Sequence, residues 1–168
     1  MPAGKRFQDI WPATTWLAVN EFDQEKHMST LYSTTVNAIG GRSGTVKSTD
    51  GLLDLPLSLP AALGGKGGAT NPEQLFAAGY AACFGNAVIH ITRNKETKVR
   101  DNDIEVAATV GMESNGSGGF TLTVALDVTI AGVDQAAAEA IVAEAHKVCP
   151  YSNATRGNID VALSVKTR

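Results

Sequence analysis

The pattern of hydrophobic and polar positions predicts short strands, a long apolar helix, a hairpin, a second helix and a closing strand. Residues 30–54 read as short strands separated by glycines, and Asp50-Gly51 is a strong tight-turn signal. This segment is therefore expected to be a β-meander. Residues 55–70 are rich in proline and glycine, which predicts a loop that leads into the first helix.

The first helix is predicted over residues 71–95. Asn71 can cap its start, Pro72 occupies the first helical position, and Gln74 fits a capping-box arrangement. The segment is apolar or small almost all the way round until its charged end, which is typical of a helix buried on most faces. Small residues around Cys83 would let another backbone approach closely; they are Gly79, Ala81, Ala82 and Gly85.

The second half of the chain alternates strand and helix patterns. Residues 103–113 and 120–130 predict a hairpin, and Asp134 can cap a helix that ends at Cys149-Pro150 because a residue before proline disfavours helical dihedrals. Residues 151–158 are expected to be a loop. The closing strand should turn one face inward through alternating residues, namely Ile159, Val161, Leu163 and Val165. This order of elements indicates an α+β fold.

The length of 168 residues allows one domain with a real core. Residues 1–27 contain both tryptophans but show no sustained strand or helix period. We therefore assign 1–27 as an N-terminal extension of unknown role and 28–168 as a single domain.

Composition narrows the function classes. With 43% hydrophobic and 18% charged residues and a formal net charge of −3, the chain has the balance of a globular protein and no electrostatic footprint for nucleic acid. No apolar run approaches the roughly 18–20 residues that a membrane span requires, and the first residues lack the apolar core of a secretory signal. The expected location is the cytoplasm, with no nucleic-acid or membrane partner.

The two cysteines are too few for a secreted disulfide scaffold, and either could be an inert core residue. Cys83 lies in the middle of the predicted helix, and a reactive thiolate there would need a stabilising cation. Arg42, in the turn GGRSG, is a candidate, although most arginines in turns are simply solvated. Cys149 lies at a helix end, where its side chain could move to form a disulfide; the alternative is a buried helix-end cysteine.

Glu73 could hold Arg42 by a bidentate contact between carboxylate and guanidinium. An acidic residue in the first turn of a helix is also favoured by the helix dipole alone, so both interpretations remain open. A zinc site using His90 or His146 with the cysteines is formally possible, and His27 is the third histidine of the chain. These residues lack the close CxxC-type spacing of such sites, so no metal is predicted.

Three separated segments, read in order, resemble the organic hydroperoxide resistance (Ohr) branch of the OsmC/Ohr family. They are GGRSGTVKSTDGLLDLPLSLP, GGKGGATNPEQLFAAGYAACF and VCPYSNATRGNIDVAL, and the likeness extends from about Leu31 to the C-terminus. The resemblance implies antiparallel β-sheets wrapped around two central helices in an intertwined homodimer, with active sites at the subunit interface.

By the same resemblance Cys83 matches the peroxidatic cysteine and Cys149 the resolving cysteine, while Arg42 matches the thiolate-stabilising arginine and Glu73 its carboxylate partner. It further implies a peroxidase that reduces alkyl or fatty-acyl hydroperoxides and is recycled by dihydrolipoyl groups on a lipoylated protein or a small carrier. No bound cofactor is expected.

One geometric argument supports a dimeric site. Glu73 and Cys83 are ten positions apart in one predicted helix, so at about 1.5 Å per residue they are about 15 Å apart and cannot share a site within one subunit. We therefore expect Arg42 and Glu73 from one chain to meet the cysteines of its partner. Two other functions stay open: a non-enzymatic thiol redox sensor, and a carrier of small apolar ligands.

Overall fold

The computed structural model describes residues 29–93, 95, 97 and 99–168. Val36–Arg168 form one compact unit, and the fold described below is that of this unit. The predicted extension 1–27 lies outside the described residues, so its assignment and the domain boundary remain predictions.

The first strands form the expected meander. Strands β1 (Val36–Ile39), β2 (Thr45–Ser48) and β3 (Asp54–Pro56) pair antiparallel in the order β1-β2-β3. Gly51 has a φ of 75°, a left-handed conformation that a glycine adopts without strain, so the Asp50-Gly51 turn is confirmed.

The second sheet contains the predicted hairpin and the closing strand. Strands β4 (Ile104–Ser114) and β5 (Phe120–Ile130) pair antiparallel along their whole lengths, and β6 (Val161–Thr167) pairs parallel to β5. The parallel pair differs from the all-antiparallel sheets that were expected. It arises because two helices follow β5 and return the chain to the end of the sheet at which β5 began. The α+β class is confirmed.

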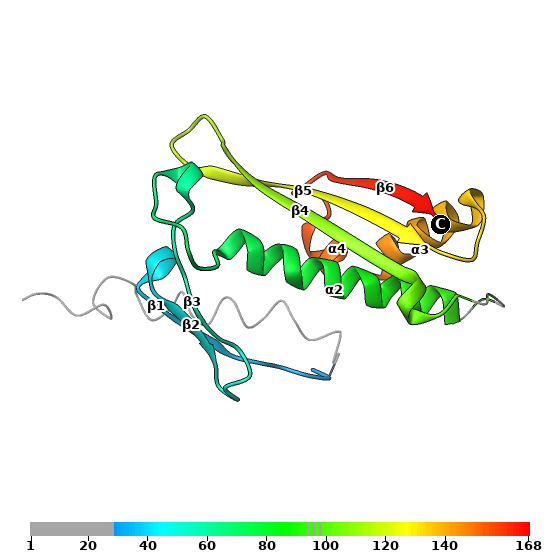
Figure 1. Ribbon diagram of the computed structural model, residues 1–168, viewed down its shortest axis with the longest axis horizontal. Helices are drawn as coiled ribbons and strands as arrows, with labels where there is room; N and C mark the ends of the chain where they lie inside the picture. Colours follow the sequence, from blue (N-terminus) through cyan, green and yellow to red (C-terminus); the bar gives the residue numbers. More distant parts are fainter. Residues whose placement is uncertain (1–28, 94, 96, 98) are drawn as a thin grey trace, which may run out of the picture. The chain divides into compact units, whose positions relative to one another are not determined.

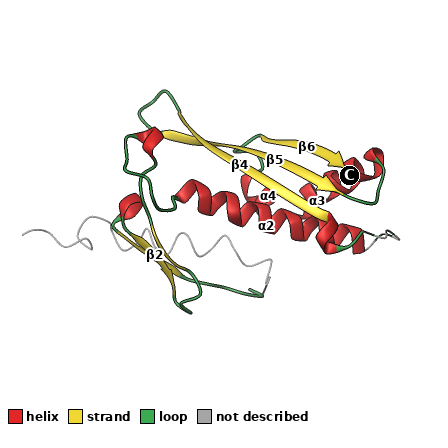
Figure 2. Cartoon of the chain, in the orientation of Figure 1, coloured by secondary structure: helices red, strands yellow, loops and turns green. Residues whose placement is uncertain are grey.

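Helices α2 (Pro72–Arg93) and α3 (Gln135–Val148) lie on one face of the β4-β5-β6 sheet (Figure 1). Figure 2 shows the same order of strands, long helix, hairpin and helix. The core between helices and sheet is formed by residues that are at most 5% exposed, among them Tyr80, Phe84, Val88, Leu126, Ile130 and Ile141. Alternate residues of β5 point into this core, which is why its sequence alternates.

The helix starts follow the sequence signals with one difference. The Asn71 side-chain oxygen accepts a hydrogen bond from the Gln74 backbone N–H at 2.9 Å, and Asp134 accepts one from the Ala137 N–H at 2.7 Å. The Gln74 side chain, however, accepts from the Thr70 hydroxyl at 2.9 Å, so its role differs from that in a capping box. Helix α2 ends at Arg93, two residues before the expected 95.

The segment expected as a loop after Cys149 is partly helical. Helix α4 spans Pro150–Thr155, with the proline at its first position. Two of its residues, Ser152 and Thr155, are buried and bonded to Tyr80, so tertiary contacts stabilise a turn that local propensity did not indicate. In β6, Leu163 pairs with the buried Leu126 and so lies on the core side as expected, but it is 37% exposed because this strand is at the sheet edge.

Helix α2 also differs from the expectation that no apolar run of the chain approaches the length of a membrane span. Among the described residues it alone is long and apolar enough to cross a membrane by length and composition, with a mean hydropathy of 1.4. Its inner face packs against β4, α3 and α4. Only 28% of its apolar 18-residue window is buried within the chain, so the expectation of a helix buried on most faces is not met within one chain.

Candidate active site

Two free thiols meet where α2 passes the junction of α3 and α4. The Cys149 Sγ lies 3.7 Å from the Cys83 Sγ. Cys149 is fully buried and Cys83 is half-buried. The sulfur atoms are therefore in contact and need to approach only to about 2.05 Å to form a disulfide.

The backbone of Cys149 is fixed from both sides. Its N–H donates to the Ala145 carbonyl at 2.9 Å as the last bond of α3, and its carbonyl accepts from the Asn153 N–H at 2.9 Å as the first bond of α4. Pro150 prevents α3 from continuing, so the chain turns at this residue. Cys149 thus lies at a helix end and is buried, and its thiol is already in contact with its potential partner.

The surroundings of Cys83 favour its neutral thiol form. Burial raises the pKa of Cys83 above its ordinary value, the backbone N–H of Tyr151 lowers this pKa, and the neighbouring Cys149 raises it again. Within the described part of the chain, no positively charged side chain is among the groups that shift the pKa of Cys83. A single chain thus brings the sulfur atoms together without the cation that a thiolate nucleophile needs.

Arg42 and Glu73 form a second, separate pair. The two guanidinium nitrogens Nη1 and Nη2 donate to the Glu73 carboxylate at 2.8 and 2.6 Å, which is the bidentate contact that the sequence left open as one of two interpretations. Nη2 also lies 3.7 Å from the Met112 Sδ. Gly44 helps to fix the turn that carries Arg42, since a Cβ at Gly44 would lie 1.7 Å from the Ile39 carbonyl oxygen.

The Arg42 hydrogen bonds hold the pKa of Glu73 below its ordinary 4.5, although burial opposes this. A depressed carboxyl pKa contributes stability that is present above the unfolded value and is lost as the pH falls through the folded one. We predict a Glu73 carboxyl titration midpoint below 4.5 by NMR, moving back toward 4.5 in Arg42→Met. A wild-type midpoint at or above 4.5 would contradict the ion pair. Arg42 is 40% exposed, so solvent weakens the effect.

The structure does not bring the two pairs together within one chain. Glu73 is in the first turn of α2 and Cys83 is ten residues further along the same continuous helix, so about 15 Å separates them along its axis. The bidentate contact holds Arg42 at the Glu73 end. All four predicted residues therefore lie on or against α2, in two groups.

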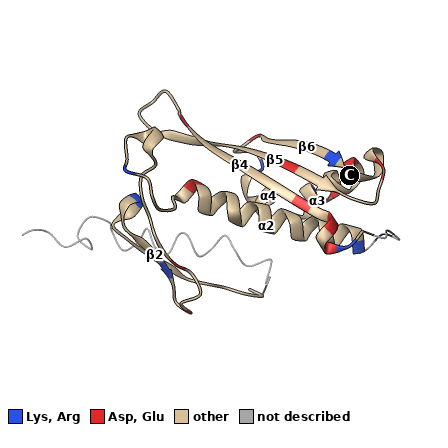
Figure 3. Cartoon of the chain, in the orientation of Figure 1, with Lys and Arg blue, Asp and Glu red and all other residues tan. Residues whose placement is uncertain are grey.

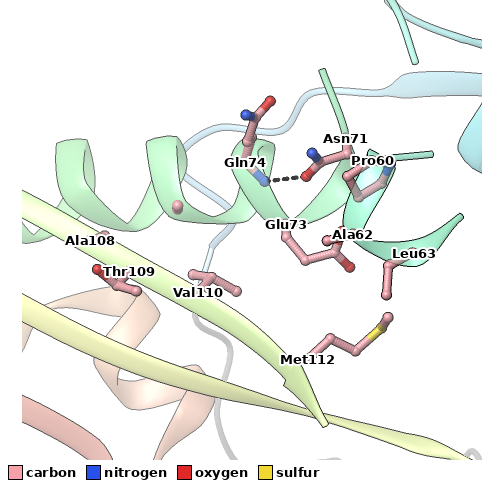
Figure 4. A pocket seen from close by; sticks show the side chains of 11 residues that line it. Pro60, Ala62, Leu63, Asn71, Glu73, Gln74, Ala108, Thr109, Val110 and Met112 are labelled. Atoms are coloured by element: carbon pink, nitrogen blue, oxygen red, sulfur yellow. Dashed lines mark hydrogen bonds between the residues drawn. The ribbon is translucent and has the colours of Figure 1, made fainter. Parts of the chain in front are cut away.

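A cavity of about 470 Å³ lies beside the Glu73 end of α2 (Figure 4). Its lining is mostly apolar and comes from the segment before α2, the first turns of α2 and strand β4; it includes Pro60, Leu63, Ala77, Val110 and Met112. Glu73 projects toward it, whereas neither cysteine lines it. The cavity is large enough for an apolar ligand of moderate size.

Sequence reasoning missed an aromatic cluster between the two pairs. The rings of Phe76, Tyr80 and Tyr151 lie with centroids 5.6 to 6.1 Å apart. The Tyr80 hydroxyl donates to the Ser152 Oγ at 3.0 Å and lies 3.2 Å from the Thr155 Oγ1. A tyrosine within an otherwise apolar helix was the available signal, because a buried phenol usually requires a polar partner.

No group of three or more His, Cys, Asp or Glu side chains able to hold a metal occurs among the described residues. His146 packs near the Phe84 ring at a centroid distance of 6.3 Å. His27 lies outside the described residues, so the absence of a metal remains a prediction.

An α+β unit in which an apolar helix brings one cysteine into contact with a second, and carries a bidentate arginine–glutamate pair at its other end, defines a two-cysteine thiol protein. Comparison with known proteins gives the family. The model of the OsmC-like protein family matches residues 65–164. The chain belongs to this family, and its relatives place it in the Ohr branch.

Those relatives share most of the chain. An organic hydroperoxide resistance protein of Xanthomonas axonopodis pv. citri is 47% identical over 136 residues, covering 80% of this chain and 94% of the relative. The crystal structure of an organic hydroperoxide resistance protein from Legionella pneumophila matches with a TM-score of 0.79 and 53% identity, covering 82% of this chain and 99% of that one. OhrB of Bacillus subtilis matches with a TM-score of 0.73 and 44% identity, covering 82% of this chain and 100% of that one.

Proposed function

We propose that this protein protects against organic peroxides as a thiol peroxidase, with Cys83 as the nucleophile and Cys149 as the resolving thiol. The observation that carries the proposal is the 3.7 Å contact between the two sulfur atoms. The names of the relatives, which are organic hydroperoxide resistance proteins, support the role in peroxide resistance.

The proposed chemistry has three steps. The Cys83 thiolate attacks the outer peroxide oxygen, the O–O bond breaks, and the alkoxide takes a proton to leave as an alcohol, so Cys83 becomes a sulfenic acid. The Cys149 sulfur then attacks the Cys83 sulfur, the S–O bond breaks, and hydroxide leaves with the Cys149 proton as water. A dithiol finally reduces the disulfide by exchange and is itself oxidised to a disulfide.

The cation for the thiolate comes, in this proposal, from a second copy of the chain. If two α2 helices pair antiparallel about a two-fold axis that passes near Ala78, midway between Glu73 and Cys83, Glu73 of each helix lies opposite Cys83 of the other, and the Arg42–Glu73 pair of one chain can approach Cys83 of its partner. This arrangement supplies what one chain lacks, because the groups that shift the pKa of Cys83 in a single chain include no cation.

The outer face of α2 supports such a homodimer. Residues exposed on it recur every four positions, namely Gln74, Ala78, Ala82, Asn86 and His90. No charged residue lies between Glu73 and Arg93 (Figure 3), and only 28% of the most apolar 18-residue window of this helix is buried within the chain. Rows at four-residue spacing pack against each other in paired helices, so a second copy fits this surface.

The proposed substrates are alkyl or fatty-acyl hydroperoxides. The cavity beside Glu73 has apolar walls that would hold the organic part of such a peroxide while its polar end faces the guanidinium. Hydrogen peroxide has no apolar part, so contact with these walls would not increase its binding affinity. A preference for organic peroxides therefore follows from the burial of apolar surface.

Dihydrolipoyl groups, on a lipoylated protein or a small carrier, are the proposed reductant, and the proposed location is the cytoplasm. The proposal includes no bound cofactor, nucleic-acid partner or membrane partner. The reductant itself rests on the resemblance of the three sequence segments to the Ohr branch.

Steady-state consumption of an alkyl hydroperoxide with dihydrolipoamide tests the function. We expect the wild-type protein to consume many equivalents, until one reactant is exhausted. A redox sensor or a ligand carrier would behave differently: the sensor stops after about one equivalent per protomer, and the carrier consumes none. Either result would contradict the peroxidase.

A further inference from the structure

We infer that Tyr80 is a positioning residue for disulfide formation: its buried hydroxyl links the turn of α2 that carries Cys83 to helix α4, which begins immediately after Cys149. The inference rests on the proposed peroxidase function. It concerns only the second chemical step, in which the Cys149 sulfur attacks the Cys83 sulfenic acid, the Cys83–oxygen bond breaks and water leaves.

The geometry joins both cysteine-bearing segments through one hydroxyl cluster. Tyr80 precedes Cys83 by three positions, and side chains at this spacing lie on neighbouring parts of a helix surface. Its hydroxyl donates to Ser152, which follows Cys149 by three positions in the first turn of α4. The two contacts, between the sulfur atoms and between the hydroxyls, are thus parallel links between the same two segments.

The hydroxyl cluster is buried and interconnected. Tyr80 and Ser152 have no exposed surface, and Thr155 is 5% exposed. The Thr155 hydroxyl contacts the Tyr80 hydroxyl at 3.2 Å and donates to the Tyr151 carbonyl at 3.0 Å. Buried polar groups of this kind fix relative position, because leaving one partner unpaired costs more than the bond itself contributes.

The hydroxyl is not needed to fill the space. Helix α2 carries phenylalanine at Phe76 and Phe84, on the turns before and after Tyr80 and facing the same core. A phenylalanine at Tyr80 would retain the ring contacts with Phe76 and Tyr151. What tyrosine adds is a directional bond to α4, which sets where the first turn of this helix lies.

A shift of α4 would act directly on the resolving sulfur. The Cys149 carbonyl accepts from Asn153 in the first turn of α4, so displacement of this helix moves the Cys149 backbone. The sulfur atoms must approach from 3.7 Å to about 2.05 Å along the line of attack. A misplacement of about 1 Å can cost on the order of 100-fold in the rate of such a step.

The Tyr80→Phe variant distinguishes an effect on sulfenic acid formation from an effect on disulfide formation. After a single alkyl hydroperoxide addition to the reduced full-length protein, quenched samples are analysed by mass spectrometry for Cys83 sulfenic acid and for the disulfide. We expect sulfenic acid formation at the wild-type rate and disulfide formation slower by about tenfold, with more Cys83 sulfinic acid under excess peroxide. Tyr32→Phe is the matched control, because Tyr32 is 77% exposed, and it should behave as the wild type.

Ser152→Ala removes the other end of the same bond and should reproduce the effect. The double variant should be no slower than either single variant, since both remove one interaction. If Tyr80→Phe does not fold, the rate of disulfide formation in Ser152→Ala alone tests the inference. Unchanged disulfide formation, or an equal slowing of both steps, would overturn the inference. A wild-type protein that forms neither sulfenic acid nor disulfide would instead refute the proposed function.

Discussion

Replacement of Cys83 by serine is expected to abolish peroxide consumption, with a loss of at least about 10³-fold in turnover. A serine hydroxyl is not ionised near neutral pH and is a far weaker nucleophile than a thiolate, so the O–O bond has no effective nucleophile. The measurement is steady-state consumption of an alkyl hydroperoxide with dihydrolipoamide.

Cys149→Ser provides the comparison for this experiment. It keeps the nucleophile, so it should consume one equivalent of peroxide to form Cys83 sulfenic acid, or two where a second peroxide oxidises this to sulfinic acid, and then stall. Turnover by Cys83→Ser above the protein-free background would assign the chemistry to another residue. Sustained turnover by Cys149→Ser would show that the 3.7 Å sulfur contact is not needed for resolution.

Mixed dimers of Arg42→Met and Cys83→Ser are expected to recover activity that neither variant has alone. The Cys83→Ser chain supplies an intact Arg42–Glu73 pair, and the Arg42→Met chain supplies the intact cysteines. Random pairing of equal amounts makes half of the dimers mixed, each with one of two sites complete, so we expect about a quarter of the wild-type activity. The chains are mixed by co-expression or by refolding, and assayed with dihydrolipoamide.

This experiment distinguishes a shared site from a site within one chain. If Arg42 served the Cys83 of its own chain, no mixed dimer could contain a complete site, and activity would stay at the level of the separate variants. A matched mixture of Cys149→Ser and Cys83→Ser should remain inactive, because each variant lacks a cysteine needed in the same chain. Recovery in this control would contradict the intrachain cysteine pair.

Local sequence signals predicted the elements that position the site. The Asn71 and Asp134 caps, the Asp50-Gly51 turn and the hairpin alternation are each encoded within a few residues, and the structure confirms them. The bidentate contact of Arg42 and Glu73 was predicted as one of two open interpretations, and both atom pairs are within hydrogen-bond distance.

The features that sequence reasoning missed depend on contacts between distant segments. Residues 151–158 were expected to form a loop, whereas the structure has helix α4. This helix is stabilised by a hydrogen bond to Tyr80, which lies 72 positions before Ser152 and so gives no local sequence signal. The parallel pairing of β6 depends on where α3 and α4 return the chain, which local alternation cannot reveal. The apolar character of α2 can be read from its sequence. Its uncovered outer face cannot, because this depends on which elements of the fold pack against the helix.

The most direct test of the central claim is peptide mapping of the protein after one equivalent of alkyl hydroperoxide, without reductant. The account predicts an intrachain disulfide between Cys83 and Cys149, formed as both free thiols disappear, because the sulfur atoms of one chain are already 3.7 Å apart. A protein in which Cys83 is oxidised while Cys149 remains a free thiol, or in which the disulfide joins two chains, would contradict it.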